Sequence, residues 1–94
     1  MKESKIERKL VNEIKKRGGL ALKFTPAGQR GYADRVLLLP GGRSVFVELK
    51  AKDEKMKKLQ AKRAAELEAL GFRVYRNVDS YEKINFVIKE MYGE

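Results

Sequence analysis

The chain has 94 residues, which is enough for one domain with a single hydrophobic core and too few for two domains. Lysine and arginine number 22 against 13 acidic residues, and the net charge of +9 favours a polyanionic partner, either nucleic acid or an acidic membrane. Because cysteine and histidine are both absent, disulfides, thiolate zinc sites and imidazole mechanisms are excluded, so any chemistry must come from carboxylates, lysines and a hard cation.

The spacing of apolar residues and of residues that end helices and strands predicts elements in the order α-β-β-β-α-β-α. In chain order they are expected at residues 5–17, 20–24, 34–39, 43–51, 54–70, 72–76 and in a last helix after Ser80. The helix between the third and fourth strands predicts a crossover connection. We therefore expect one α/β domain over residues 1–94, with a mixed central sheet flanked by helices.

The helices are predicted from their apolar faces. The first has Leu10, Val11 and Ile14 on one stripe and ends at Gly18-Gly19. In the second, the apolar positions that share a face are Met56, Leu59, Leu67 and Leu70. The last helix follows Ser80 as its N-cap, and its i, i+3, i+4, i+7 stripe consists of Ile84, Val87, Ile88 and Met91.

The strand at 43–51 carries two charged residues in an otherwise apolar run. Because side chains alternate along a strand, Glu48 and Lys50 share one face with Phe46, while Val47 and Leu49 take the other. In isolation this pattern fits equally well a solvent-facing sheet edge with an i, i+2 ion pair. The position of Asp34 on the preceding strand favours a functional role instead.

Two registers of the hairpin are open, and they place Asp34 on different faces. A two-residue Gly41-Gly42 loop would put Asp34 on the face opposite Glu48. A three-residue loop that starts at Pro40 pairs Leu39 with Arg43 and sets Asp34 directly across from Glu48, and proline at the first position of a type I turn with a left-handed Gly42 favours it. Two facing carboxylates are unfavourable unless a cation lies between them, so this register predicts a metal site.

The first helix supplies a third candidate acid. Glu7 extends the apolar stripe, but residues 4–7 also match a capping box in which Glu7 would bond back to the amide of Ser4. Glu3 lies near the same stripe and is the rival if Glu7 is only a cap. In the second helix Gln60 and Arg63 also fall within the apolar stripe, where long polar side chains can reach past the rim of the core.

Asp34 followed by Glu48-Leu49-Lys50 within this element order resembles the PD-(D/E)XK superfamily of restriction enzymes and junction resolvases. The surrounding residues 31–35, the Gly41-Gly42 hairpin and the downstream Gln60 are similar to the virus-type replication-repair nuclease domain, VRR-NUC. The likeness runs from about Glu7 to Tyr75. It implies a restriction-endonuclease-like core and a metal-dependent DNA endonuclease acting on branched DNA such as Holliday junctions. The family usually has proline where this chain has Ala33, which affects the entry to the strand more than the chemistry.

The resemblance implies catalytic roles for Asp34, Glu48 and Lys50. It also favours functional roles for Glu7 and Gln60 over the structural roles described above. Asp34 and Glu48, with the Leu49 carbonyl and a contribution from Glu7, offer the oxygen ligands that Mg²⁺ or Mn²⁺ prefers. The candidates for positioning phosphate are Lys23, Arg30 and Arg63.

The resemblance also implies a small stand-alone phage protein that acts as a homodimer in the cytoplasm of a bacterial host. The last helix carries Phe86 and Tyr92 beyond its buried stripe, so we expect it to contribute to the dimer interface. No apolar run approaches a bilayer span, which argues against a membrane partner. The competing functions are a basic nucleic-acid-binding module without catalysis and a protein-interaction domain.

Overall fold

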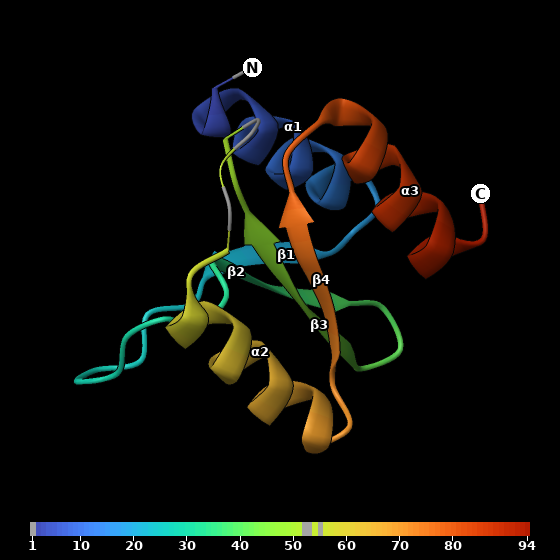
Figure 1. Cartoon of the computed structure of the whole chain (residues 1–94). Coiled ribbons are helices and arrows are strands. Elements are labelled where there is room, and N and C mark those ends of the chain that lie inside the picture. The colour runs from blue at the N-terminus through green and yellow to red at the C-terminus, as the bar shows by residue number, and fades with distance from the viewer. Residues whose placement is uncertain (1, 52–53, 55) are drawn as a thin grey trace.

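A computed structural model of the protein describes residues 2–51, 54 and 56–94. Its elements are α1 (Glu3–Lys16), β1 (Leu20–Lys23), β2 (Arg35–Leu39), β3 (Arg43–Leu49), α2 (Lys58–Ala69), β4 (Arg73–Val78) and α3 (Tyr81–Tyr92). The predicted order α-β-β-β-α-β-α is confirmed. The loop between β1 and β2 extends away from the rest of the chain (Figure 1).

The four strands form one sheet in the order β1-β2-β3-β4. The first two pairings are antiparallel, and β3 pairs with β4 in parallel. A parallel pair needs a crossover, and α2 provides it. The mixed sheet with flanking helices predicted from the sequence is therefore correct.

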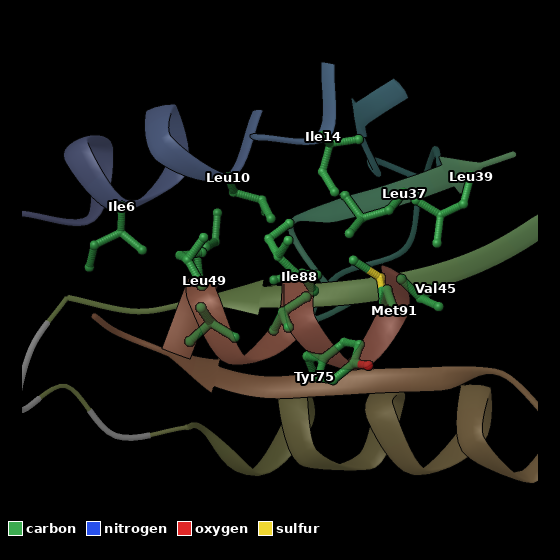
Figure 2. Packing of buried hydrophobic residues seen from close by; sticks show 14 residues of the cluster. Ile6, Leu10, Ile14, Leu37, Leu39, Val45, Leu49, Tyr75, Ile88 and Met91 are labelled. Carbon is green, nitrogen blue, oxygen red and sulfur yellow. The ribbon is translucent and has the colours of Figure 1, made fainter. Parts of the chain in front are cut away.

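Helices lie on both faces of the sheet, with α1 and α3 side by side on one face and α2 on the other (Figure 1). The larger core cluster fills the space between the sheet and the α1/α3 pair, where Ile6, Leu10 and Ile14 point from α1 toward the strands (Figure 2). The smaller cluster, around Phe46 and Leu67, lies beneath α2. On β1 and β2, by contrast, several large apolar side chains stay exposed: Leu20, Leu22 and Leu38.

The hairpin between β2 and β3 has the predicted three-residue loop, because Leu39 pairs with Arg43. Its turn differs from the expected type I. Both Gly41 and Gly42 have positive φ, 83° and 76°, whereas a type I turn after Leu39 would need a negative φ at Gly41. Positive φ at the third turn residue, after proline at the second, is the type II pattern, and glycine at both positions permits it without steric cost.

The helix expected over 54–70 is shorter, because α2 begins only at Lys58. Residue 55, inside the predicted range, lies outside the described residues. The predicted apolar face was also partly wrong, since Leu59 and Leu70 are 39% and 75% exposed while Ala64 is buried. The helix start was placed too early because charged residues with good helix propensity precede Lys58. The wrong face was predicted because packing against β4 decides which residues of α2 are buried.

The α3 helix follows the prediction closely. The Ser80 hydroxyl accepts a hydrogen bond from the Lys83 amide at 3.1 Å, and the predicted stripe is buried. Tyr92 packs against the core, so this aromatic residue is absorbed by the protein's own fold, while Phe86 stays 54% exposed. No helix in the described part of the chain is both long and apolar enough to cross a membrane.

The pairing of β3 with β4 is interrupted beside Glu48. Val47 pairs with Tyr75 but Leu49 pairs with Val78, so Arg76 and Asn77 together oppose Glu48. This is a β-bulge, and Asn77 adopts a positive φ of 55° within it. After the bulge, Val78 lies in the same core cluster as Tyr75.

Candidate active site

The end of the β2–β3 hairpin brings the predicted acids together. Arg35 pairs with Val47, and continuing that register by one residue sets Asp34 across from Glu48. An Asp34 carboxylate oxygen accepts a hydrogen bond from the Leu49 amide at 2.7 Å, which fixes the side chain against β3. The chain thus places Asp34, Glu48 and Lys50 at one end of the sheet.

Two of these charged side chains are buried. Glu48 and Lys50 are 1% and 5% exposed, in positions where ionised groups are rare unless paired. The Lys50 Nζ lies 3.9 Å from Glu48 Oε1 and 3.7 Å from a carboxylate oxygen of Glu54, both longer than a good hydrogen bond. Within the described residues, Glu48 Oε1 has no hydrogen-bond partner at all.

The electrostatic surroundings disfavour charge on both acids. Burial raises the pKa of Glu48, nearby Asp34 raises it further, and Lys50 only partly offsets the effect. Burial also raises the pKa of Asp34, against the opposing hydrogen bond from the Leu49 amide. A cation bound between the carboxylates would reverse this penalty by stabilising their charged forms.

Glu7 is not part of a capping box, which corrects one of the two interpretations of this residue. The helix already begins at Glu3, its N-cap is Lys2, and no side chain caps it. Glu7 instead lies 2.9 Å from Arg35 in a partly buried ion pair. It also lines a hollow of about 420 Å³ together with Glu3 and Asp34.

Glu3 joins the site as well. Its pKa is raised, mainly by burial and then by repulsion from Asp34 and Glu54, so these acids lie close enough to influence one another. The sequence left Glu3 only as a rival to Glu7, but the hollow contains both side chains. The first turns of α1 therefore supply two acids on the Asp34 side of the site.

The remaining predicted residues divide into two groups. Lys23 lines the hollow and Arg30 is exposed, so both are accessible to a ligand. Gln60 caps α2 by accepting a hydrogen bond from the Lys57 amide at 3.0 Å. Arg63 donates to Glu66 and to the Arg30 carbonyl, and its guanidinium lies 4.9 Å from the Tyr32 ring centroid.

Those contacts give Gln60 and Arg63 structural roles in this conformation. Gln60 caps α2, and Arg63 holds the loop between β1 and β2 against that helix. Two further residues near the site were not predicted from the sequence. Glu54 approaches Lys50 from four residues further along the chain, outside any predicted helix face that would have brought them together. Arg35 binds Glu7 across 28 residues of sequence, and nothing local could have indicated that contact.

The acidic side chains at the site supply only part of the ligand set that a hard divalent cation needs. Among the described residues, no group of three acidic side chains is arranged to hold a metal ion. Asp34 and Glu48 would therefore need main-chain oxygen and water to complete a coordination shell, which is the usual situation for Mg²⁺. The buried Glu48 oxygen without a partner is the observation that favours such an ion, because an orphaned carboxylate oxygen is otherwise costly.

We expect Glu48→Gln to raise the thermal stability of the metal-free protein. A raised pKa in the folded state means that the charged Glu48 costs stability once pH exceeds the unfolded-state value near 4.5. The isosteric amide removes this cost, and relief of about 1 kcal/mol would raise Tm by about 4 to 8 °C at neutral pH. Circular dichroism melts in EDTA between pH 4 and pH 8 measure the difference. It should shrink toward zero near pH 4, and a variant less stable at neutral pH would contradict the prediction.

Comparison with known proteins agrees with the fold. No profile of a known protein family matches the chain. The chain is 46% identical over 74 residues to a protein of Acyrthosiphon pisum secondary endosymbiont phage 1 named "Putative nuclease p44", covering 79% of this chain and 80% of that one. A solved structure described as a VRR_NUC domain superposes with a TM-score of 0.87 at 24% identity, over 96% of this chain and 97% of the other. The chain therefore belongs to the same family as this putative phage nuclease, and it has the fold of a VRR_NUC domain.

Proposed function

We propose that this nuclease is an Mg²⁺- or Mn²⁺-dependent endonuclease that hydrolyses phosphodiester bonds in DNA. The observation that carries the proposal is the buried Glu48 carboxylate, which has an oxygen without a hydrogen-bond partner among the described residues and faces Asp34 across the hairpin. A structural ion pair would bring the Lys50 ammonium within hydrogen-bond distance of that oxygen, but the two atoms lie 3.9 Å apart. A metal-binding carboxylate leaves it available.

Asp34, Glu48 and the Leu49 carbonyl are the groups that would hold the ion. When bound, the ion supplies Lewis-acid polarisation of the phosphate and a more acidic water. Asp34 is positioned for this role by the Leu49 amide, which orients its carboxylate before substrate arrives. Glu48 is positioned by burial within β3.

Lys50 has the second role. Its ammonium lies between Glu48 and Glu54 at distances that leave donors available to a third partner. An attacking water or a phosphate oxygen fits that description, so Lys50 orients the nucleophile and stabilises the negative charge that develops on the phosphate. Glu7, beside Asp34 in the hollow, holds a water at the edge of the site.

The substrate is DNA, and we propose that branched molecules such as four-way junctions are preferred. The net charge of +9 supports a nucleic-acid substrate. The acids at the site disfavour phosphate by themselves, so affinity must come from the basic surface around them. Lys23 and Arg30 flank the hollow and the projecting loop, where they can position a strand entering the site.

The test is incubation of the protein with labelled linear, flap and four-way DNA in Mg²⁺, Mn²⁺ or EDTA. Cutting that needs a divalent ion and is fastest on the four-way substrate is expected. Binding without cutting under all conditions would identify a non-catalytic nucleic-acid-binding module. No binding to any DNA at low salt would instead favour a protein-interaction domain.

We expect Glu7→Gln to reduce cleavage about tenfold and to lower Tm by no more than about 4 to 8 °C. The ion pair with Arg35 is partly exposed, so its loss affects stability by no more than about 1 kcal/mol. The charge beside Asp34 is lost as well, which is the change that affects cleavage. Glu3→Gln is the comparison, and single-turnover rates with parallel melts measure both variants. Full activity of Glu7→Gln combined with slow cleavage by Glu3→Gln would transfer the role to Glu3.

We also propose that the active form is a homodimer, because two symmetry-related cuts in a junction need two sites in fixed relation. Phe86 on α3 is 54% exposed and supports an interface there. Leu22, 45% exposed on the uncovered half of the sheet, marks the rival surface.

Analytical ultracentrifugation at micromolar concentration is expected to give a dimer that Phe86→Glu dissociates. Replacing this large exposed aromatic residue with a charge would place that charge in a desolvated interface. Leu22→Glu is the matched variant on the sheet. A dimer that survives Phe86→Glu but not Leu22→Glu would move the interface to the sheet, and an active monomer would end the dimer proposal.

A further inference from the structure

The outer face of α1 carries a continuous basic stripe. Its members follow the spacing of one helical face, and they are Lys5, Arg8, Lys9, Asn12, Lys15 and Lys16. The opposite face consists of Ile6, Leu10 and Ile14, which are fully buried and point toward the sheet (Figure 2). The stripe therefore lies on the side of α1 that faces away from the core.

Among the described residues outside the stripe, most arginines are paired with acids, whereas lysines such as Lys58, Lys62 and Lys89 are in no salt bridge. Within the described residues, the arginines that lie within 4.0 Å of a carboxylate are Arg17, Arg35, Arg63, Arg73 and Arg76. In the stripe only Lys16 has such a contact, with Glu13 at 3.4 Å. The salt bridges found over residues 2–51, 54 and 56–94 include none from Lys5, Arg8, Lys9 or Lys15, so the stripe keeps most of its positive charge.

This arrangement opposes the stability of the helix. Lys5 and Lys9 are like charges at i, i+4, and Lys5 and Arg8 are like charges at i, i+3, spacings at which repulsion destabilises a helix. Cations in the first two turns also oppose the helix dipole. The stripe carries five cations and one neutral residue, Asn12, and Glu13 at its edge pairs with Lys16, so its net positive charge favours a polyanionic partner.

The stripe borders a groove rather than a flat surface. An open hollow of about 920 Å³ is lined by stripe residues, by Glu13, which pairs with Lys16 and Arg17, and by Tyr81 at the start of α3. The Lys9 Nζ lies 5.3 Å from the Tyr81 ring centroid, and the ring is 40% exposed. Cations beside an accessible aromatic ring are the combination that contacts phosphates and bases in nucleic-acid grooves.

The groove and the active site share one helix. Glu3 and Glu7 turn toward the hollow that contains Asp34, while Lys5 and Arg8 lie in the same two turns on the outer face. From Lys5 to Lys16 the stripe is about 16 Å long at about 1.5 Å of rise per residue. At about 3.4 Å of axial rise per nucleotide, that length corresponds to about five phosphates of one strand.

We propose that the basic stripe of α1 binds the sugar-phosphate backbone of a DNA arm next to the cleaved position. The inference rests on the proposed nuclease function, because it assigns the surface that holds the substrate whose phosphate reaches Asp34. An anionic membrane is the other polyanion to consider. Membrane-surface helices insert a free apolar face. In α1, Ile6, Leu10 and Ile14 are buried against the sheet and Val11 is half-buried, so DNA is favoured.

The test compares two variants that each remove three positive charges from the net charge of +9. One changes the stripe, Lys5→Gln/Arg8→Gln/Lys9→Gln. The other changes exposed lysines on α2 and α3, Lys58→Gln/Lys62→Gln/Lys89→Gln. Binding of fluorescein-labelled duplex and four-way DNA is titrated in EDTA over a range of NaCl concentrations. Glutamine keeps helix propensity, and circular dichroism checks that each variant is folded.

The stripe variant is expected to bind at least tenfold more weakly. Because three phosphates are no longer neutralised, the slope of log K against log [NaCl] should fall by about 2.7. The control should lose less than threefold. Equal losses, or an unchanged slope, would overturn the proposal, as would wild-type binding to phosphatidylserine vesicles that the stripe variant loses while its DNA binding is intact. If the triple variant does not fold, Lys9→Gln/Lys15→Gln is compared with Lys58→Gln/Lys62→Gln, and the expected slope change is about 1.8.

This experiment separates the two proposals. Binding is measured without a divalent ion, so a wild-type protein that binds through the stripe but never cuts would disprove the nuclease function and leave the surface intact. A wild-type protein that cuts normally while the stripe variant binds normally would disprove only the surface. At saturating protein, the stripe variant should cut at the wild-type single-turnover rate, because no stripe residue touches the reacting phosphate.

Discussion

Replacing Asp34 with asparagine is expected to lower the cleavage rate about a thousandfold, the upper range for loss of one preorganised electrostatic group at an active site. Glu48→Gln should have the same effect. The asparagine carboxamide oxygen can still accept the 2.7 Å hydrogen bond from the Leu49 amide, so the local geometry should survive while the charge is lost. Glu48→Gln likewise preserves shape in a position that is 1% exposed.

DNA binding should be unchanged or tighter in both variants, because each removes a negative charge that repels phosphate. Single-turnover cleavage in Mn²⁺ and equilibrium binding in EDTA measure the two properties separately. Glu82→Gln, at an exposed acid in the first turn of α3, is the matched control and should cut normally. Parallel loss of binding and cutting, or cleavage by Asp34→Asn within tenfold of wild type, would remove these residues from the active site.

The second large effect is expected from Lys50→Met, which should slow cleavage by about a hundredfold to a thousandfold. Methionine fills a similar volume in this 5% exposed position but provides neither charge nor hydrogen-bond donors. Binding should weaken only slightly, because one buried cation contributes little to the long-range attraction of DNA. Lys50→Arg should recover little activity, since a planar guanidinium cannot replace a compact ammonium between Glu48 and Glu54.

Loss of Lys50 also leaves Glu48 with less compensation, so stability must be separated from chemistry. Rates should be measured well below Tm, and the double variant Glu48→Gln/Lys50→Met restores neutral surroundings. We expect the double variant to be more stable than Lys50→Met alone and equally inactive. Lys58→Met, on the exposed start of α2, is the control for loss of one lysine. Activity of Lys50→Met within tenfold of wild type would assign Lys50 a structural role.

The parts of the fold that local sequence determines were predictable. The hairpin register follows from three consecutive residues, since proline and two glycines permit the loop that pairs Leu39 with Arg43. That register brought Asp34 and Glu48 together before any long-range contact was considered. The buried stripe of α3 and its Ser80 cap were predictable for the same reason, because both depend on spacing within one helix.

Contacts between distant segments were not predictable. The local pattern at residues 4–7 indicated a cap, but the helix starts earlier and Glu7 finds Arg35, which is remote in sequence. The capping interaction occurs instead at α2, where Gln60 bonds to the Lys57 amide. Gln60 had been chosen by resemblance as an active-site residue, and spacing alone cannot separate a helix cap from a catalytic group.

The extra residue in β4 bears on how this chain can differ in length from its relatives. Arg76 and Asn77 together fill one step of the ladder, so a strand one residue shorter would still turn Val78 toward the same core as Tyr75. The architecture alone therefore does not require the insertion. It is opposite Glu48, where it relaxes the pairing beside a buried acid. We expect relatives that have lost the buried acid on β3 to be able to lose the extra residue of β4 as well. A one-residue gap in β4 would then mark relatives that no longer cleave DNA.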